Sequence, residues 1–228
     1  MTQGILLALL AATVYGFLGV AFELAAKRNY PNWDFALYKQ LFGTILGLLF
    51  VFWLKLPLYE NRILAIALAG AVCYVATLWA YLTASRERDI AANWTILNLS
   101  VALPVLLSVF WFNDRFTSAK AFGVVLTISS VIFIGGIGAQ RLEFTIKWVR
   151  WITVAFLLNG WFVVLLRFVP EGLGALFTVY FYGISVVLVL AYKLISRERL
   201  AHGRGILAVA ALGACTHWSG IMLTILAA

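Results

Sequence analysis

Charged residues are scarce in this chain of 228 residues, because Asp, Glu, Lys and Arg together make up only 11% of it. A soluble domain carries about 25% charged and about 45–50% apolar residues, whereas 64% of this sequence is hydrophobic. The net charge is +8, but the basic residues lie mostly in short gaps between apolar runs and form no single patch. The composition therefore excludes an ordinary soluble enzyme, a disordered chain and a nucleic-acid-binding domain.

Motifs for catalysis, metal binding and disulfide formation are also missing from the sequence. The two cysteines, Cys73 and Cys215, are too few for a disulfide framework and lack zinc-ligand spacing. The sequence contains no H-E-x-x-H, no G-x-S-x-G and no nucleotide-binding loop. An enzyme of the membrane interior is therefore disfavoured, and we expect no enzymatic activity, no metal and no cofactor.

Long apolar runs fill most of the chain. A helix that crosses a bilayer needs about 20 mostly apolar residues. Runs of this kind cover residues 4–26, 34–54, 63–84, 90–112, 121–138, 148–169, 174–195 and 206–227. Because lipid cannot satisfy open backbone groups, and because the runs are too long for strands, each is predicted to be a helix. The sequence thus predicts an all-α polytopic protein with eight transmembrane helices, a multi-pass protein of the inner (cytoplasmic) membrane in contact with the lipid bilayer.

Two of these runs resemble each other at a fixed distance along the chain. Residues 63–84 align with residues 206–227 at an offset of 143 without gaps, and the first run aligns with the sixth at an offset of 144. A repeat of five spans has an odd number of crossings, so its second copy enters the membrane from the opposite side. We therefore expect an inverted repeat, with residues 1–142 as the first unit (helices 1–5) and residues 143–228 as an incomplete second unit (helices 6–8).

The order of features around the fourth and fifth runs resembles a known family. An apolar helix with a central Pro104 is followed by an Asp114-Arg115 turn, where Glu-Arg is usual, and then by Gly123 in the next helix. Together with Tyr15-Gly16, which is similar to a Trp-Gly in the first helix, these features resemble the EamA-like ten-helix branch of the drug/metabolite transporter superfamily. The resemblance implies a central cavity between two inverted five-helix units, of which the last two helices are not in this sequence.

Polar and aromatic side chains within the spans are the candidate substrate-binding residues, because polar groups at the bilayer centre are costly and are usually functional. The predicted set is Tyr15, Tyr74, Trp79, Asn98, Asn159, Trp161, Tyr182, His217 and Trp218. The repeat relates Tyr15 to Asn159 and Tyr74 to His217, so these two pairs are expected at one level of the membrane. The competing interpretation is packing, with hydrogen bonds between neighbouring helices.

Three further residues are expected to control movement. Glu23 and Lys39 flank the first loop and are predicted to form a gate, whereas the alternatives are a local pair of Glu23 with Lys27 and a Lys39 side chain that reaches the interface. Pro104 is predicted to kink the fourth helix, because it removes one backbone hydrogen bond.

The sequence therefore predicts a transporter that moves small metabolites, such as amino acids or drugs, by alternating access through a central cavity. The alternative is a non-transporting fragment or subunit that requires a homo-oligomer, because two helices of the ten-helix pattern are missing. Basic residues are more numerous in the odd-numbered loops, which predicts an N-terminus outside the cell. The family resemblance implies a cytoplasmic N-terminus, so both orientations remain open.

Overall fold

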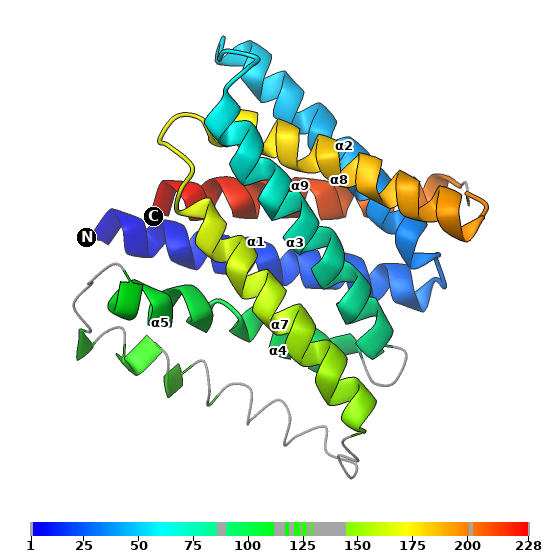
Figure 1. Ribbon diagram of the computed structural model, residues 1–228, viewed down its shortest axis with the longest axis horizontal. Helices are drawn as coiled ribbons and strands as arrows, with labels where there is room; N and C mark the ends of the chain where they lie inside the picture. Colours follow the sequence, from blue (N-terminus) through cyan, green and yellow to red (C-terminus); the bar gives the residue numbers. More distant parts are fainter. Residues whose placement is uncertain are drawn as a thin grey trace. The chain divides into compact units, whose positions relative to one another are not determined.

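Every regular element in the described part of the chain is a helix, which confirms the all-helical prediction. The computed structural model describes residues 2–85, 90–111, 117–118, 121–123, 125–126, 129, 145–200 and 203–227. In chain order the helices are α1 (Thr2–Lys27), α2 (Asn32–Trp53), α3 (Asn61–Ser85), α4 (Ile90–Leu99), α5 (Ala102–Trp111), α7 (Ile146–Leu166), α8 (Gly174–Ser196) and α9 (Arg204–Ala227) (Figure 1). Most of the fifth expected span, residues 121–138, lies outside the described residues.

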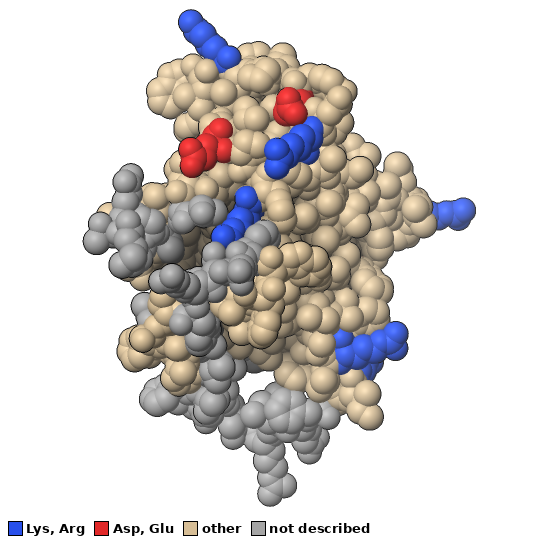
Figure 2. Space-filling view, turned by 60° about the vertical axis from the view of Figure 1, so that its left-hand side comes forward, with Lys and Arg blue, Asp and Glu red and all other residues tan. Residues whose placement is uncertain are grey.

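Most of these helices have the length and composition of membrane spans. Among the described residues, six segments are long and apolar enough to cross a membrane, and Leu9–Ala25 of α1 forms a shorter apolar helix. Large apolar side chains such as Phe17, Phe52 and Val187 are exposed, as expected where lipid surrounds the protein. Figure 2 shows few charged side chains among the described residues of one face, most of which is formed by uncharged residues. The chain is therefore a multi-pass membrane protein.

The chain forms two compact units, which we call the terminal unit and the central unit. The terminal unit comprises Met1–Val75 and Leu165–Ala228, and the central unit comprises Ala76–Val164. The terminal unit combines helices from both copies of the predicted repeat.

Within the terminal unit, α1 packs along α9, and α2 packs along both α8 and α9 (Figure 1). Small residues permit this close packing, as is usual between membrane helices. A Cβ atom at Gly43 of α2 would lie 2.9 Å from the ring of Tyr182 on α8, and one at Gly220 of α9 would lie 2.8 Å from the ring of Tyr15 on α1. These glycines therefore set the depth at which the two tyrosine rings lie between the helices.

In the central unit, the expected fourth span is divided into α4 and α5. The amide of Ser100 donates to the carbonyl of Leu97, only three residues back, over 3.1 Å. Pro104 has no N–H for the Ser100 carbonyl four residues back, and that carbonyl accepts instead from the Leu103 amide over 2.9 Å. The predicted kink concerned this segment, and the structure places a break between the two helices one turn before the proline.

A glycine of α7 lies against this break. A Cβ atom at Gly160 would come within 2.8 Å of the Leu103 side chain and within 3.1 Å of the Ser100 carbonyl oxygen. The backbone of α7 can approach α4 and α5 this closely only because the side chain is absent.

Replacing Gly160 with alanine is expected to lower the midpoint of thermal unfolding in detergent. Overpacking costs about 1–3 kcal/mol, which exceeds the gain of up to about 1 kcal/mol from better helix propensity. Gly16→Ala is the matched control, because a Cβ at Gly16 meets nothing within 4 Å, and it should leave the midpoint unchanged or raise it. Equal midpoints for the two variants would contradict the close approach.

Candidate functional site

A buried polar cluster lies inside the terminal unit, where four helices contribute one side chain each. Its members are Lys39 of α2, Tyr74 of α3, Tyr182 of α8 and His217 of α9, and all four are buried. Lys39 Nζ donates to Tyr74 Oη over 2.7 Å and lies 3.0 Å from His217 Nδ1. Tyr182 Oη lies 3.0 Å from the same Nδ1. One histidine nitrogen therefore connects α2, α8 and α9.

The contacts of His217 determine where its ring carries the proton. An ammonium group has donors and no acceptor, so Nδ1 of His217 accepts from Lys39. Nδ1 has a single lone pair, so the Tyr182 hydroxyl, 3.0 Å away, shares this acceptor with Lys39. With Nδ1 as the acceptor, the neutral imidazole carries its proton on Nε2.

Aromatic rings enclose the histidine. The ring of Tyr74 stacks on His217 with centroids 5.1 Å apart, and Phe181 lies edge-on at 6.1 Å. Tyr15 of α1 is the next ring, at 6.3 Å. The Lys39 ammonium lies 4.8 Å from the centroid of the Tyr74 ring, within the range of a cation–π contact.

The cluster is rich in hydrogen-bond donors and lacks an acid. Within the described residues, both polar partners of Lys39 are uncharged groups. Gln40, the next residue on α2, is fully buried, and neither of its amide atoms has a hydrogen-bond partner in the described structure. Among the described residues, no group of three or more His, Cys, Asp or Glu side chains could hold a metal. The cluster is thus suited to polar binding through hydrogen bonds and one cation.

The remaining predicted residue of the terminal unit has a packing role. Trp218 follows His217, but its Nε1 donates to Thr178 Oγ1 over 3.0 Å, and its ring packs at 4.4 Å on Phe50. Of the predicted set, the structure therefore brings together Tyr74, Tyr182 and His217, with Tyr15 beside them.

Three predicted residues of the central unit are exposed. Asn98 donates to the carbonyl of Trp94 in its own helix over 2.8 Å. Trp79 is 43% exposed and packs edge-on against Trp151, and Trp161 is 44% exposed. None of the three contributes to a buried polar cluster among the described residues.

Asn159 contacts the break between α4 and α5. Its amide donates to Ser100 Oγ over 2.7 Å and to the Leu97 carbonyl over 3.4 Å. The side chain therefore ties α7 to the last turn of α4 and to Ser100 in the break.

The two residues of the expected gate have separate partners. Glu23 pairs with Lys27, one turn later on the exposed end of α1, over 2.7 Å. Lys39 belongs to the buried cluster, and no ion pair joins it to Glu23 in the described part of the chain.

Sequence reasoning did not assign Lys39 or Gln40 to the substrate site. One signal does point to Lys39, because the offset of 143 that relates Tyr74 to His217 also relates Lys39 to Tyr182. Applied to the second span, this offset would have placed all four residues in one set.

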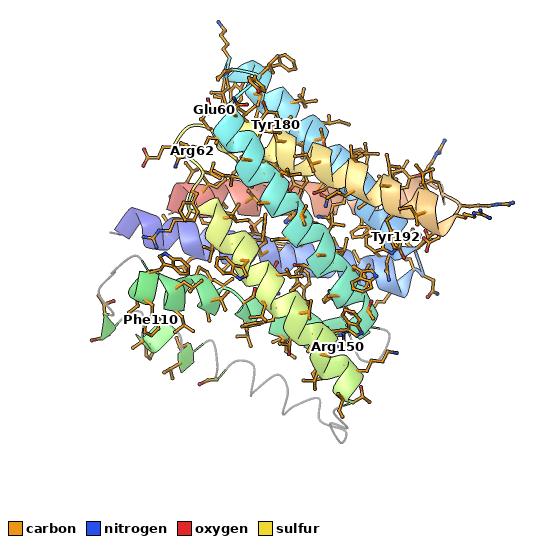
Figure 3. All side chains as sticks on the ribbon, in the orientation of Figure 1. Glu60, Arg62, Phe110, Arg150, Tyr180 and Tyr192 are labelled. Carbon is orange, nitrogen blue, oxygen red and sulfur yellow. The ribbon has the colours of Figure 1, made fainter. Side chains whose placement is uncertain are left out.

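A second pair of buried charged residues lies in the terminal unit, between the start of α2 and the end of α8. The Lys193 ammonium donates to the Asp34 carboxylate, and both side chains are buried. Lys193 also donates to the Arg199 carbonyl over 3.3 Å, and Trp33 packs on Tyr192 with ring centroids 4.4 Å apart. In Figure 3, Tyr192 lies toward this end of α8 and Tyr180 toward the other end. The pair therefore ties one end of α8 to α2.

Lys193→Met is expected to destabilise the protein by about 3–5 kcal/mol, because it leaves the Asp34 carboxylate buried without its ammonium partner. The double variant Asp34→Asn/Lys193→Met should recover most of this loss in thermal unfolding measurements in detergent. Lys27→Met removes an exposed pair and should cause no measurable change. A Lys193→Met midpoint equal to that of the unaltered chain would refute a stabilising role for the pair.

Asn159→Leu is expected to lower stability by about 1 kcal/mol, the scale of a hydrogen bond between membrane helices. The matched control is Asn98→Leu, because the Asn98 amide bonds only within its own helix. Thermal unfolding in detergent should separate the two variants, and equal midpoints would show that Asn159 does not stabilise the break.

Comparison with known proteins gives two matches. The sequence profile of the EamA-like transporter family matches residues 2–136. A protein of Pseudomonas fluorescens (strain Pf0-1), named "Probable 4-amino-4-deoxy-L-arabinose-phosphoundecaprenol flippase subunit ArnF", is 33% identical over 93 residues, which are 40% of this chain and 69% of that protein. These matches confirm the resemblance found in the sequence and indicate a transporter rather than an enzyme. The chain belongs to the EamA-like transporter family.

Proposed function

We propose that this protein moves a small molecule across the membrane by exposing the buried polar cluster to each side in turn. The observation that carries the proposal is the cluster of Lys39, Tyr74, Tyr182 and His217 within four apolar helices. Ionisable side chains inside a membrane are costly and usually lie on substrate or ion pathways. The proposed site therefore comprises these four residues, with Tyr15 beside them.

The contacts of the cluster support an inverted repeat. At the offset of 143, the contact of Lys39 with Tyr74 corresponds to the contact of Tyr182 with His217. We propose that residues 1–142 and 143–228 are copies of one unit, the second incomplete, and that their equivalent side chains meet in the cluster. In transporters built from inverted repeats, the substrate site lies where the repeats meet, and rocking of one repeat against the other opens it to either side.

The second candidate function is that of a flippase subunit, which acts with a partner chain or a second copy and moves the headgroup of a lipid. The relative from Pseudomonas fluorescens is named as a flippase subunit for a lipid-linked aminosugar, and this name is what favours the candidate. The bacterial relative also supports the inner membrane as the location.

Alternating access can be tested with a cysteine near the cluster. Ser185 of α8 is buried one turn from Tyr182 and bonds only within its own helix in the described structure. In a chain without Cys73 and Cys215, both of which are free thiols, Ser185→Cys should react with a membrane-impermeant thiol reagent from both faces of oriented vesicles.

The control for this experiment is Ser196→Cys, at the exposed end of the same helix, which should react from one face only. If Ser185→Cys reacts from a single face, or from neither, the cluster is not exposed in turn to the two sides and the proposal fails.

A further inference from the structure

We infer that the buried cluster binds an anionic group of the substrate, a phosphate or a carboxylate, through the ammonium group of Lys39. The inference rests on the proposed function, since it assumes that substrate reaches the cluster. It assigns the recognition of a negative charge to a named side chain, which neither the family description nor the name of the relative does.

The two buried lysines of the terminal unit differ in their partners. Lys193 is paired with the carboxylate of Asp34, which is the usual way in which a buried charge is tolerated. Lys39 is fully buried, but its partners in the described structure are the hydroxyl of Tyr74 and the imidazole of His217. Among the described residues, one buried lysine is thus neutralised by a carboxylate, and no anion lies beside the other.

The Lys39 ammonium group also has a hydrogen-bond donor that no described residue uses. An ammonium group has three N–H donors, of which two are used by Tyr74 and His217. The third has no partner among the described residues. An anion placed beside Nζ would receive this donor and would supply the missing negative charge in a medium where the attraction is strong.

Neighbouring polar groups also favour an oxygen ligand that accepts hydrogen bonds. The Gln40 amide is buried and makes no hydrogen bond of ordinary geometry in the described structure. The Tyr74 hydroxyl is its electrostatic neighbour, so its N–H₂ group is a further donor near this hydroxyl. Lysine binds phosphate as a point charge, so one Lys39 with neutral donors around it suits a singly or doubly charged oxyanion.

The same oxyanion can come from two sources, the phosphorylated headgroup of a lipid or a free phosphorylated or carboxylated metabolite. The cluster recognises the charge and the oxygen atoms that both have in common. Three probes separate these sources: farnesyl phosphate as a lipid phosphate, farnesol as its uncharged match, and inorganic phosphate as the free anion.

The test is thermal unfolding of the purified full chain in a neutral detergent with each probe. Ligands that bind the folded state raise the unfolding midpoint, and we expect farnesyl phosphate to raise it by a few degrees in a saturable way. Farnesol should give no shift. A shift with inorganic phosphate as well identifies a site for free anions, whereas a shift with farnesyl phosphate alone identifies a site for lipid phosphates, and either result supports the inference.

Variants of Lys39 test whether its ammonium group binds the probe. Lys39→Met should raise the farnesyl phosphate concentration needed for a half-maximal midpoint shift at least about tenfold. Lys39→Arg should retain part of the shift. Without probe, Lys39→Met should lower the unfolding midpoint less than Lys193→Met does. The loss of two hydrogen bonds is offset because the variant also removes a buried charge that has no anionic partner among the described residues. Lys55→Met, which removes an exposed lysine after the end of α2, should keep the full shift.

The outcomes distinguish failure of the inference from failure of the proposed function. Equal shifts with farnesol and farnesyl phosphate, no shift with any probe, or a full shift in Lys39→Met would overturn the anion site, even if Ser185→Cys reacts from both faces. Reaction of Ser185→Cys from one face overturns the proposed function instead. The comparison of farnesyl phosphate with farnesol uses the unaltered chain, so it decides the matter even if Lys39→Met does not fold.

Discussion

The hydrogen bonds that converge on Nδ1 of His217 are the interaction on which the terminal unit depends. Lipid is as apolar as the side chains it would replace, so helices in a membrane are held by close packing and polar contacts rather than by burial from water. Here one nitrogen receives Lys39 from α2 and Tyr182 from α8. The same contacts hold the helices together and place a cation among neutral groups. The atoms that join the helices are therefore also the atoms of the proposed binding site.

The central unit uses buried polar groups differently. Asn93 accepts from Trp148 Nε1 over 2.7 Å and donates to Ser85 Oγ over 3.1 Å, and Asn159 joins α7 to the break after α4. These asparagines satisfy hydrogen bonds between helices without introducing charge. A structural role accounts for them, whereas burying the ammonium group of Lys39 costs free energy that a neutral hydrogen-bonding side chain at the same place would not.

The helical fold could be predicted from composition and run length, because lipid leaves the backbone few alternatives. The second run, expected at residues 34–54, is α2 at Asn32–Trp53. The residues of the buried cluster were predicted in part. The position of a residue along a span gives its depth in the membrane, but it does not show which face of the helix packs inward. Trp161 lies at the expected depth and is exposed, whereas Lys39 was assigned to a gate because it lies near a helix end. Its inward direction depends on how α2 packs against α8 and α9, which the sequence of α2 alone does not specify.

The division of the fourth span after Leu99 has a mechanical consequence. Two short helices joined by two non-helical residues bend at a lower free-energy cost than one continuous helix. α4 and α5 can therefore tilt against each other without unwinding. The Asn159 amide bonds to Leu97 in α4 and to Ser100 in the break. These bonds attach α7 to the end of α4. Because α5 begins beyond both residues, at Ala102, it can pivot at the break while the end of α4 stays attached to α7 within the central unit.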